Sequence, residues 1–290
     1  MKLRNLGVSI LFIFLILFAV QNGWASKLVE MKVVDKDYLM LHFQDGEVKF
    51  VDDGKGENAY HGHHSEADNS YVVSYGEALD VTNATDVSNW IISSADDPNY
   101  GTEGISPTAS YRKTKVNGMS YTGWNHVISD HGFDYTYEHF IYLHLPHSLQ
   151  DNKTYTVEIN ESTNSDTTSQ SITFDIFNCP SEAIHTNLVG YMSSSRVKSA
   201  DLYHFLGDGG NRDYSDFVGN DVFIYNVDTE QSQRVGSVAF WMESKTETNH
   251  NLTGSDVWNV DFTGFNQTGT YRLAVEGVGC SEDFEIRDDI

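Results

Sequence analysis

Several common features are scarce or missing in this sequence. No stretch of a dozen residues has helical periodicity, and no Gly-x-Ser-x-Gly elbow or glycine-rich phosphate loop occurs. Neither of the two cysteines lies in a recognisable nucleophile motif. Only four prolines are available, so glycine, asparagine and aspartate must form most turns. Eighteen Lys and Arg face 42 Asp and Glu, and the net charge of −24 argues against nucleic acid or an anionic membrane as a partner.

The longest apolar run lies at the start of the chain. Lys2 and Arg4 precede LGVSILFIFLILFAV, and QNGWA then leads to Ser26. A basic start, a short apolar stretch and a small residue before the cut are typical of a secretory signal peptide, whereas a membrane span would be longer. We therefore expect a signal peptide over residues 1–25 and a secreted or periplasmic bacterial protein without a membrane anchor after cleavage. The alternative is an uncleaved anchor.

The remaining sequence is rich in strand signals. Short segments dense in β-branched and aromatic residues predict strands at 37–43, 47–51, 71–75, 140–145, 154–159, 171–177, 221–227 and 271–275. Asp45 and Gly46 predict a tight hairpin between the first two. The predicted fold class is all-β.

Two segments of the chain resemble each other. LQDNKTYTVEI (149–159) and FNQTGTYRLAV (265–275) share an apolar residue, a polar stretch, a tyrosine and an alternating strand. A tyrosine at this corner of an immunoglobulin-like sandwich points inward and bonds nearby backbone. Tyr155 and Tyr271 therefore predict two tandem sandwiches, over residues 26–178 and 181–290, with a boundary near NCPSEA (178–183). Coincidence between two hairpins is the alternative.

The second predicted sandwich carries a specific motif. SEAIHTNLVGYMSSSRVKSADLY (181–203) resembles the opening of the immunoglobulin-like domain that precedes the catalytic module in family 9 glycoside hydrolases, the cellulase family. The matching positions are Ile184, Asn187, Val189, Gly190 and Tyr191. The closing segment VWNVDFTGFNQTGTYRLAV followed by EDFEI is also similar. The loop HFLGDGGNRDYSDF (204–217) departs from the shortest members of that family.

This resemblance implies a function. In family 9 enzymes the last strand leads into an (α/α)₆ barrel that hydrolyses O-glycosyl bonds, so we expect residues 26–290 to be a non-catalytic N-terminal portion that braces or orients such a barrel. The expected ligand of the parent protein is a plant-type or other polysaccharide. One alternative is a self-standing secreted carbohydrate-binding or adhesion protein. Another is a self-sufficient hydrolase with its carboxylates in residues 26–178.

Two clusters of polar residues invite a chemical role. Asp208 and Asp213 flank a glycine-rich turn, but their spacing differs from the Asp-Ala-Gly-Asp type motif that supplies the family's catalytic base, and a solvated acidic loop is favoured. HGHHSEAD (61–68) places three histidines and two acids together, which could hold a metal ion, but no second ligand group is visible and a solvated loop is again favoured. The sequence therefore predicts no catalytic residues, no metal site and no cofactor.

Aromatic residues and the cysteines supply the remaining candidates. YTGWNHVISDHGFDYTYEHF (121–140) sets Tyr121 and Trp124 among polar residues, and aromatic rings pack on the C–H faces of sugars, so these two are candidate glycan contacts. The alternative, that these aromatics fill a core or edge strand, is favoured. Cys179 and Cys280 precede the first and last strands of the second sandwich, where strands of immunoglobulin-like folds run side by side, and they predict a disulfide.

Overall fold

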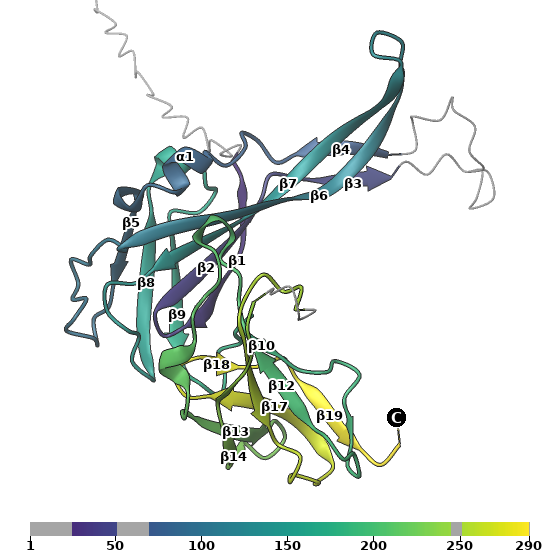
Figure 1. Cartoon of the computed structure of the whole chain (residues 1–290). Coiled ribbons are helices and arrows are strands. Elements are labelled where there is room, and N and C mark those ends of the chain that lie inside the picture. The colour runs from purple at the N-terminus through teal and green to yellow at the C-terminus, as the bar shows by residue number, and fades with distance from the viewer. Residues whose placement is uncertain (1–24, 51–69, 245–250, 290) are drawn as a thin grey trace, which may run out of the picture.

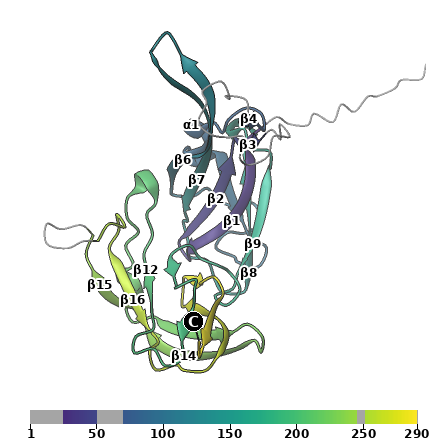
Figure 2. The same cartoon turned by 90° about the vertical axis from the view of Figure 1, so that its right-hand side faces the viewer.

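The protein is almost entirely built from β-strands, which confirms the predicted fold class. The computed structural model describes residues 25–50, 70–244 and 251–289. These residues form two β-sandwiches, from which one long hairpin projects (Figures 1 and 2). Helical structure in the described part is confined to short turns: α1 (Val81–Ala84), η2 (Val87–Asn89), η3 (Glu161–Thr163), η4 (Gly207–Gly209) and η5 (Ser215–Phe217). The expected signal peptide lies outside the described residues, apart from Ala25.

The first sandwich packs a four-stranded sheet on a three-stranded one. The larger sheet, in the order β1-β2-β7-β6, comprises β1 (Lys27–Asp35), β2 (Tyr38–Gln44), β7 (Asp130–His144) and β6 (Ala109–Asn125). The smaller sheet comprises β5 (Trp90–Ser93), β8 (Lys153–Ile159) and β9 (Ser169–Phe174), in the order β5-β8-β9. Alternate residues face inward, so Leu41 and Ile141 from one sheet share a fully buried core with Trp90 and Val157 from the other.

The second sandwich also has two sheets. One has the order β10-β12-β16-β15 and comprises β10 (Ile184–His185), β12 (Ser199–Leu202), β16 (Val257–Asp261) and β15 (Ala239–Met242). The other, in the order β11-β19-β17-β13-β14, comprises β11 (Tyr191–Met192), β19 (Phe284–Arg287), β17 (Gly269–Val275), β13 (Asp221–Asn226) and β14 (Gln231–Ser237), with β18 (Gly279–Cys280) beside β17. The opening strand β11 runs parallel to the final strand β19, while the other strand pairs are antiparallel.

The hairpin predicted at Asp45 and Gly46 is wrong. The residues that turn the chain are Lys36 and Asp37, because β2 pairs with β1 along its length. After β2 the chain leaves the sheet, and β3 (Gly46–Phe50) pairs instead with β4 (Ser70–Ser74). The Asp45 side chain holds the backbone in place where the chain leaves β2. Its carboxylate accepts the Leu79 backbone N–H at 3.0 Å and contacts His139 Nε2 at 2.9 Å.

The strands β6 and β7 extend together beyond the first sandwich, and we call this projecting hairpin the arm (Figure 1). The β3–β4 hairpin covers one face of the arm, where Ser70 Oγ lies 2.9 Å from Ser120 Oγ. Ser120 and Thr136 on this face are buried, and a side chain at Gly118 would collide with Val48. Small residues on β6 therefore allow the two hairpins to pack closely.

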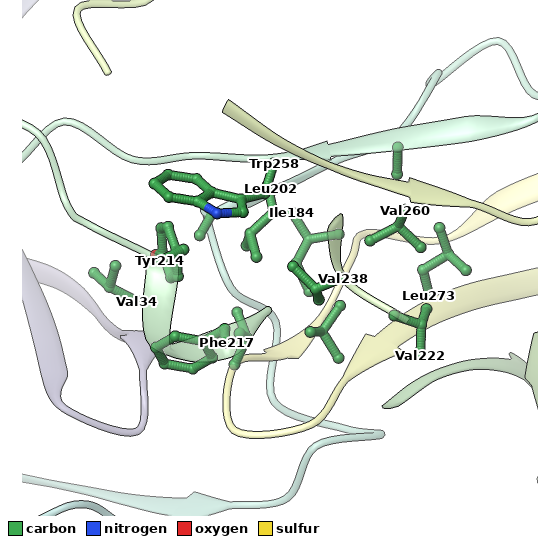
Figure 3. Close-up of a cluster of buried hydrophobic side chains, with 14 of the residues drawn as sticks. Val34, Ile184, Leu202, Tyr214, Phe217, Val222, Val238, Trp258, Val260 and Leu273 are labelled. Carbon is green, nitrogen blue, oxygen red and sulfur yellow. The ribbon is translucent and has the colours of Figure 1, made fainter. Parts of the chain in front are cut away.

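The two sandwiches meet through a hydrophobic cluster that joins the interior of the second to the outer face of the first, while the interior of the first forms a separate cluster. Val34, Tyr38 and Met40 lie on the outer face of the first sandwich's larger sheet, yet they belong to the same buried cluster as the second sandwich's interior. Figure 3 shows Val34 beside Tyr214 and Phe217, which lie at the short helical turn η5. A shared cluster of this kind favours a fixed arrangement of the two domains over independent motion.

Candidate functional site

A buried ion pair crosses the junction between the sandwiches. Arg212, in the loop between β12 and β13, donates from Nε to Asp35 Oδ2 at 2.7 Å and from Nη2 to Asp35 Oδ1 at 3.2 Å. Nη2 also donates to Asp37 Oδ2 at 3.1 Å. The guanidinium lies over the rings of Tyr38 and Tyr214, with its central carbon 4.8 and 5.2 Å from their centroids. The fork geometry and the ring contacts suit arginine and not lysine.

The burial of this pair governs its electrostatics. Asp35 is fully buried, and burial raises the pKa of its carboxyl, which the hydrogen bond and charge of Arg212 oppose. Burial also disfavours the charge on Arg212, but the Asp35 carboxylate outweighs it and raises the pKa of the guanidinium. Each charge therefore depends on the other for its place in a dry junction.

Asp208 and Asp213, in the loop that carries Arg212, are exposed, as the solvated acidic loop favoured by the sequence requires, and each also accepts a backbone hydrogen bond. Asp208 Oδ1 accepts the backbone N–H of Arg112 on the first sandwich at 2.6 Å, and Asp213 Oδ1 accepts the backbone N–H of Ser215 at 2.8 Å. Gly207 has φ +70°, and a side chain there would collide with the Arg112 carbonyl. The glycines and acids of GDGGNRDY hold the loop against the first sandwich, which leaves the two aspartates with structural partners.

The two corner tyrosines are both buried near the start of the strands β8 and β17. Tyr155 is fully buried, and its hydroxyl accepts the Gln150 backbone N–H at 2.8 Å and donates to Asp97 Oδ2 at 2.7 Å. Tyr271 is 3% exposed, and its hydroxyl donates to the Thr268 carbonyl at 3.2 Å. Each ring therefore ties the strand to the turn that precedes it.

The predicted disulfide is absent, because Cys179 and Cys280 are both free and buried. The backbone N–H of Cys280 donates to the Cys179 carbonyl at 3.0 Å. In this isolated parallel β-bridge, however, the residue directly opposite Cys280 is Pro180. Neighbouring side chains of an extended segment point to opposite faces, so Cys179 turns away from Cys280 and into the core of the first sandwich. A one-residue offset thus separates the thiols although the backbones touch.

The residues of the Val-Gly-Tyr motif build a turn. Gly190 has φ +100°, and a Cβ there would lie 2.5 Å from the Glu285 carbonyl oxygen, so only glycine fits. The Tyr191 hydroxyl accepts the Asn187 backbone N–H at 3.0 Å and donates to the Ser199 carbonyl at 2.7 Å. Val189, in contrast, is 64% exposed. The motif therefore reflects the demands of the fold and not a reaction.

The candidate glycan contacts lie on the arm. Trp124 is 45% exposed and lies opposite His131, with ring centroids 5.0 Å apart. Tyr121 is half-buried and lies opposite Phe133, with ring centroids 5.6 Å apart. Trp124 lies on the edge strand β6, which agrees with the edge-strand half of the alternative, but Trp124 and Phe133 are both exposed and do not fill a core.

Three of the pockets lined by described residues can be compared with what glycoside hydrolysis needs. A pocket of about 380 Å³ beside β5 and β8 holds one carboxylate, Glu158. A second at the β13–β14 hairpin is lined by amides, hydroxyls and rings without a carboxylate. The third, open beside β19, is lined by Glu285, Asp288 and Asp289; Glu285 pairs with Arg287 at 3.2 Å, and Asp288 accepts a hydrogen bond from Ser193. Hydrolysis requires two carboxyl groups that face each other across the bond to be cleaved.

Neither a metal-binding cluster nor a membrane-spanning helix occurs among the described residues. Within residues 25–50, 70–244 and 251–289, no group of three or more His, Cys, Asp or Glu side chains could hold a metal ion. The histidine-rich segment 61–68 lies outside these ranges. Across the same described ranges, no helix has the length and apolar character needed to span a bilayer.

Comparison with known proteins gives weak similarities. No family model and no curated protein matches the chain. A metagenome-derived glycoside hydrolase family 9 endoglucanase is 26% identical over 36% of this chain and 18% of its own, with a TM-score of 0.29. A GH9 protein of Bacteroides ovatus is 18% identical over 36% of this chain and 15% of its own, with a TM-score of 0.25. The N-terminal part of the bacterial S-layer protein SbsC is 12% identical over 91% of this chain and 44% of its own, with a TM-score of 0.27.

Each match covers less than half of the other protein's length, and the TM-scores are too low for an overall superposition.

Proposed function

We propose that this chain is the non-catalytic N-terminal portion of a secreted bacterial glycoside hydrolase of the family 9 type, in which two sandwiches act as one rigid brace for a catalytic barrel. The observation that carries the proposal is the Asp35–Arg212 pair beside a hydrophobic cluster to which both sandwiches contribute. A brace must transmit orientation, and a packed hydrophobic contact between domains does so better than a flexible linker. The sequence resemblance of residues 181–290 supplies the family.

The catalytic part of such an enzyme lies outside these 290 residues. The direct test is to read the coding sequence beyond the codon for Ile290 and to express the complete product. We expect a barrel whose thermal unfolding temperature drops by several degrees when residues 181–290 are deleted. The bracing role would be contradicted if the following domain is unrelated to hydrolases, or if the deletion leaves the unfolding temperature of the barrel unchanged.

The described chain by itself is expected to lack hydrolase activity. The assay is release of reducing ends from β-glucan by purified residues 26–290, and turnover that co-purifies with the chain through successive columns would contradict the proposal. N-terminal sequencing of the exported protein should begin at Ser26 if residues 1–25 are a signal peptide.

A second candidate is a self-standing secreted carbohydrate-binding or adhesion protein. The exposed aromatic rings of the arm favour it, because soluble proteins seldom expose such groups together without a ligand. A stop codon directly after Ile290 would make it the better assignment.

A further inference from the structure

The arm carries a row of exposed aromatic side chains on one face. Strand pairing sets Met119 opposite Tyr135 and Tyr121 opposite Phe133, and side chains opposite each other in an antiparallel pair share a face. With Trp124 and Tyr137 they form what we call the aromatic face: Met119, Tyr121, Trp124, Phe133, Tyr135 and Tyr137. Phe133, Tyr135 and Tyr137 are each 40–45% exposed.

This face continues the inner face of the first sandwich. Along β7, Ile141 and Leu143 point into the core and are fully buried, and the period of two along a strand places Tyr137, Tyr135 and Phe133 on the same side. The smaller sheet covers the core, and the far end of the arm projects beyond it in both views (Figures 1 and 2). Among the described residues, the β3–β4 pair covers the opposite face of the arm, whereas five side chains of the aromatic face stay exposed: Met119, Trp124, Phe133, Tyr135 and Tyr137.

The rings hold one another in place. His131 Nδ1 lies 3.2 Å from the Tyr121 hydroxyl, and its ring packs edge-on against Trp124. Phe133 contacts both Tyr121 and Tyr135, with centroids 5.6 and 6.3 Å away. From residue 131 to residue 137 the strand advances about 20 Å. The result is a long, preorganised row of rings with hydroxyl groups along it, suited to an extended ligand.

The charge pattern selects an uncharged ligand. The chain has 42 acidic residues, but those of β7 in the arm, Asp130, Asp134 and Glu138, fall on the opposite side by the period of two along the strand. A polyanion would be repelled by the net charge of −24, and so would a second copy of the chain. Sugars without charged groups offer C–H faces to the rings and hydroxyls to the tyrosine and histidine polar atoms.

We propose that the aromatic face binds a linear, neutral polysaccharide several sugar units long. This role goes beyond bracing and does not depend on it, since it would hold whether or not a catalytic barrel is attached. The two proposals therefore fail separately: the coding sequence and domain deletion test the brace, and direct binding tests the arm.

The test is affinity electrophoresis of residues 26–290 in gels containing β-glucan, xylan or mannan, with polygalacturonate as the anionic comparison, followed by calorimetric titration with oligosaccharides of the retarding polymer. We expect at least one neutral polymer to retard the chain and polygalacturonate to have no effect. Trp124→Ala and Tyr135→Ala should each weaken binding at least tenfold. Trp241→Ala is the matched control, because Trp241 is 55% exposed but lies on β15 of the second sandwich.

Several results would overturn this proposal. Failure of all three neutral polymers to retard the chain would do so, as would equal losses in Trp124→Ala and Trp241→Ala. If the wild-type chain instead dimerises and Trp124→Ala abolishes the dimer, the face is a self-association surface. Circular dichroism and the unfolding temperature of each variant must match the wild type, which we expect because the substituted rings are exposed.

Discussion

Arg212 of the second sandwich donates two hydrogen bonds to Asp35 of the first, across 177 positions of sequence, and Asp35 has no exposed surface. Among the ion pairs of the described residues, no other pair between the two sandwiches is as deeply buried. The stability of the junction should therefore depend strongly on each partner.

Replacing Arg212 with Met should destabilise the protein by about 3–5 kcal/mol, because the Asp35 carboxylate would stay buried without a counter-charge. Urea unfolding monitored by tryptophan fluorescence measures the loss. Adding Asp35→Asn to Arg212→Met should recover part of the stability, since no uncompensated charge remains.

Arg234→Met is the control for that series. Arg234 pairs with Asp221 at 2.6 Å, but the two side chains are 55% and 41% exposed, so its loss should cost less than about 1 kcal/mol. Equal effects of the two arginine substitutions would show that the junction pair is not buried in solution.

Acid should destabilise the protein partly through His204. Burial, with help from the nearby Lys113 charge, lowers the pKa of His204 to about 3, whereas an unfolded histidine titrates near 6.5. The unfolded chain therefore binds one more proton between these values. The stability from this group is complete above pH 6.5 and falls by about 1.4 kcal/mol for each pH unit below it.

The slope of unfolding free energy between pH 6.5 and 5 tests this expectation. His204→Asn should flatten the slope by about 1.4 kcal/mol per pH unit. His126→Asn, at an exposed histidine between β6 and β7, is the control variant. A His204→Asn slope that equals the wild-type slope would rule out a buried, neutral His204.

The two corner tyrosines should differ in their contribution. Tyr155→Phe removes a donor to the fully buried carboxylate of Asp97 and an acceptor for Gln150, and we expect a cost of about 1.5–3 kcal/mol. Tyr271→Phe removes one longer bond to the Thr268 carbonyl and should cost about 0.5–1 kcal/mol. Tyr135→Phe, at an exposed ring, should be neutral, and the reverse order of the corner effects in urea unfolding would contradict these contacts.

Both cysteines should be inert thiols in the native protein. Burial raises the pKa of Cys179 to about 11 and that of Cys280 to about 12. At pH 8 a thiol reagent should therefore react with neither thiol until the chain is unfolded. In denaturant without reductant, two thiols per chain should react with the reagent. If no thiol reacts, the offset register is wrong and a disulfide forms.

The sequence predicted those features that depend on neighbouring residues. The strands, the tyrosine at each corner and the glycine in the Val-Gly-Tyr turn all follow from local patterns of polarity and backbone freedom. The Asp35–Arg212 junction could not be predicted in this way, because it joins the last residue of β1 to a loop 177 positions away, and neither segment has a local pattern that indicates the other. The disulfide prediction was wrong because Cys280 lies opposite Pro180, one position after Cys179. That two strands are close does not fix their register.

The arm shows a different limit. Residues 133–138 alternate between aromatic and polar side chains, whereas residues 140–143 are all apolar or aromatic. The odd-numbered positions of both parts fall on one face, so the pattern indicates one inward face for the whole strand. Whether a second sheet covers that face depends on the lengths of β5, β8 and β9, which end before they reach the arm. The pattern thus identified the aromatic residues but could not show that half of the face is open.

The central claim, that the two sandwiches form one rigid body, is tested most directly by a distance distribution between them. Spin labels can be attached at Gln170→Cys on β9 and Gln231→Cys on β14, both exposed, while the native thiols stay buried. Pulsed electron resonance should give a single narrow distribution for the otherwise native chain and a broader one when Arg212→Met is added. A broad or multimodal distribution without that substitution would contradict a fixed junction.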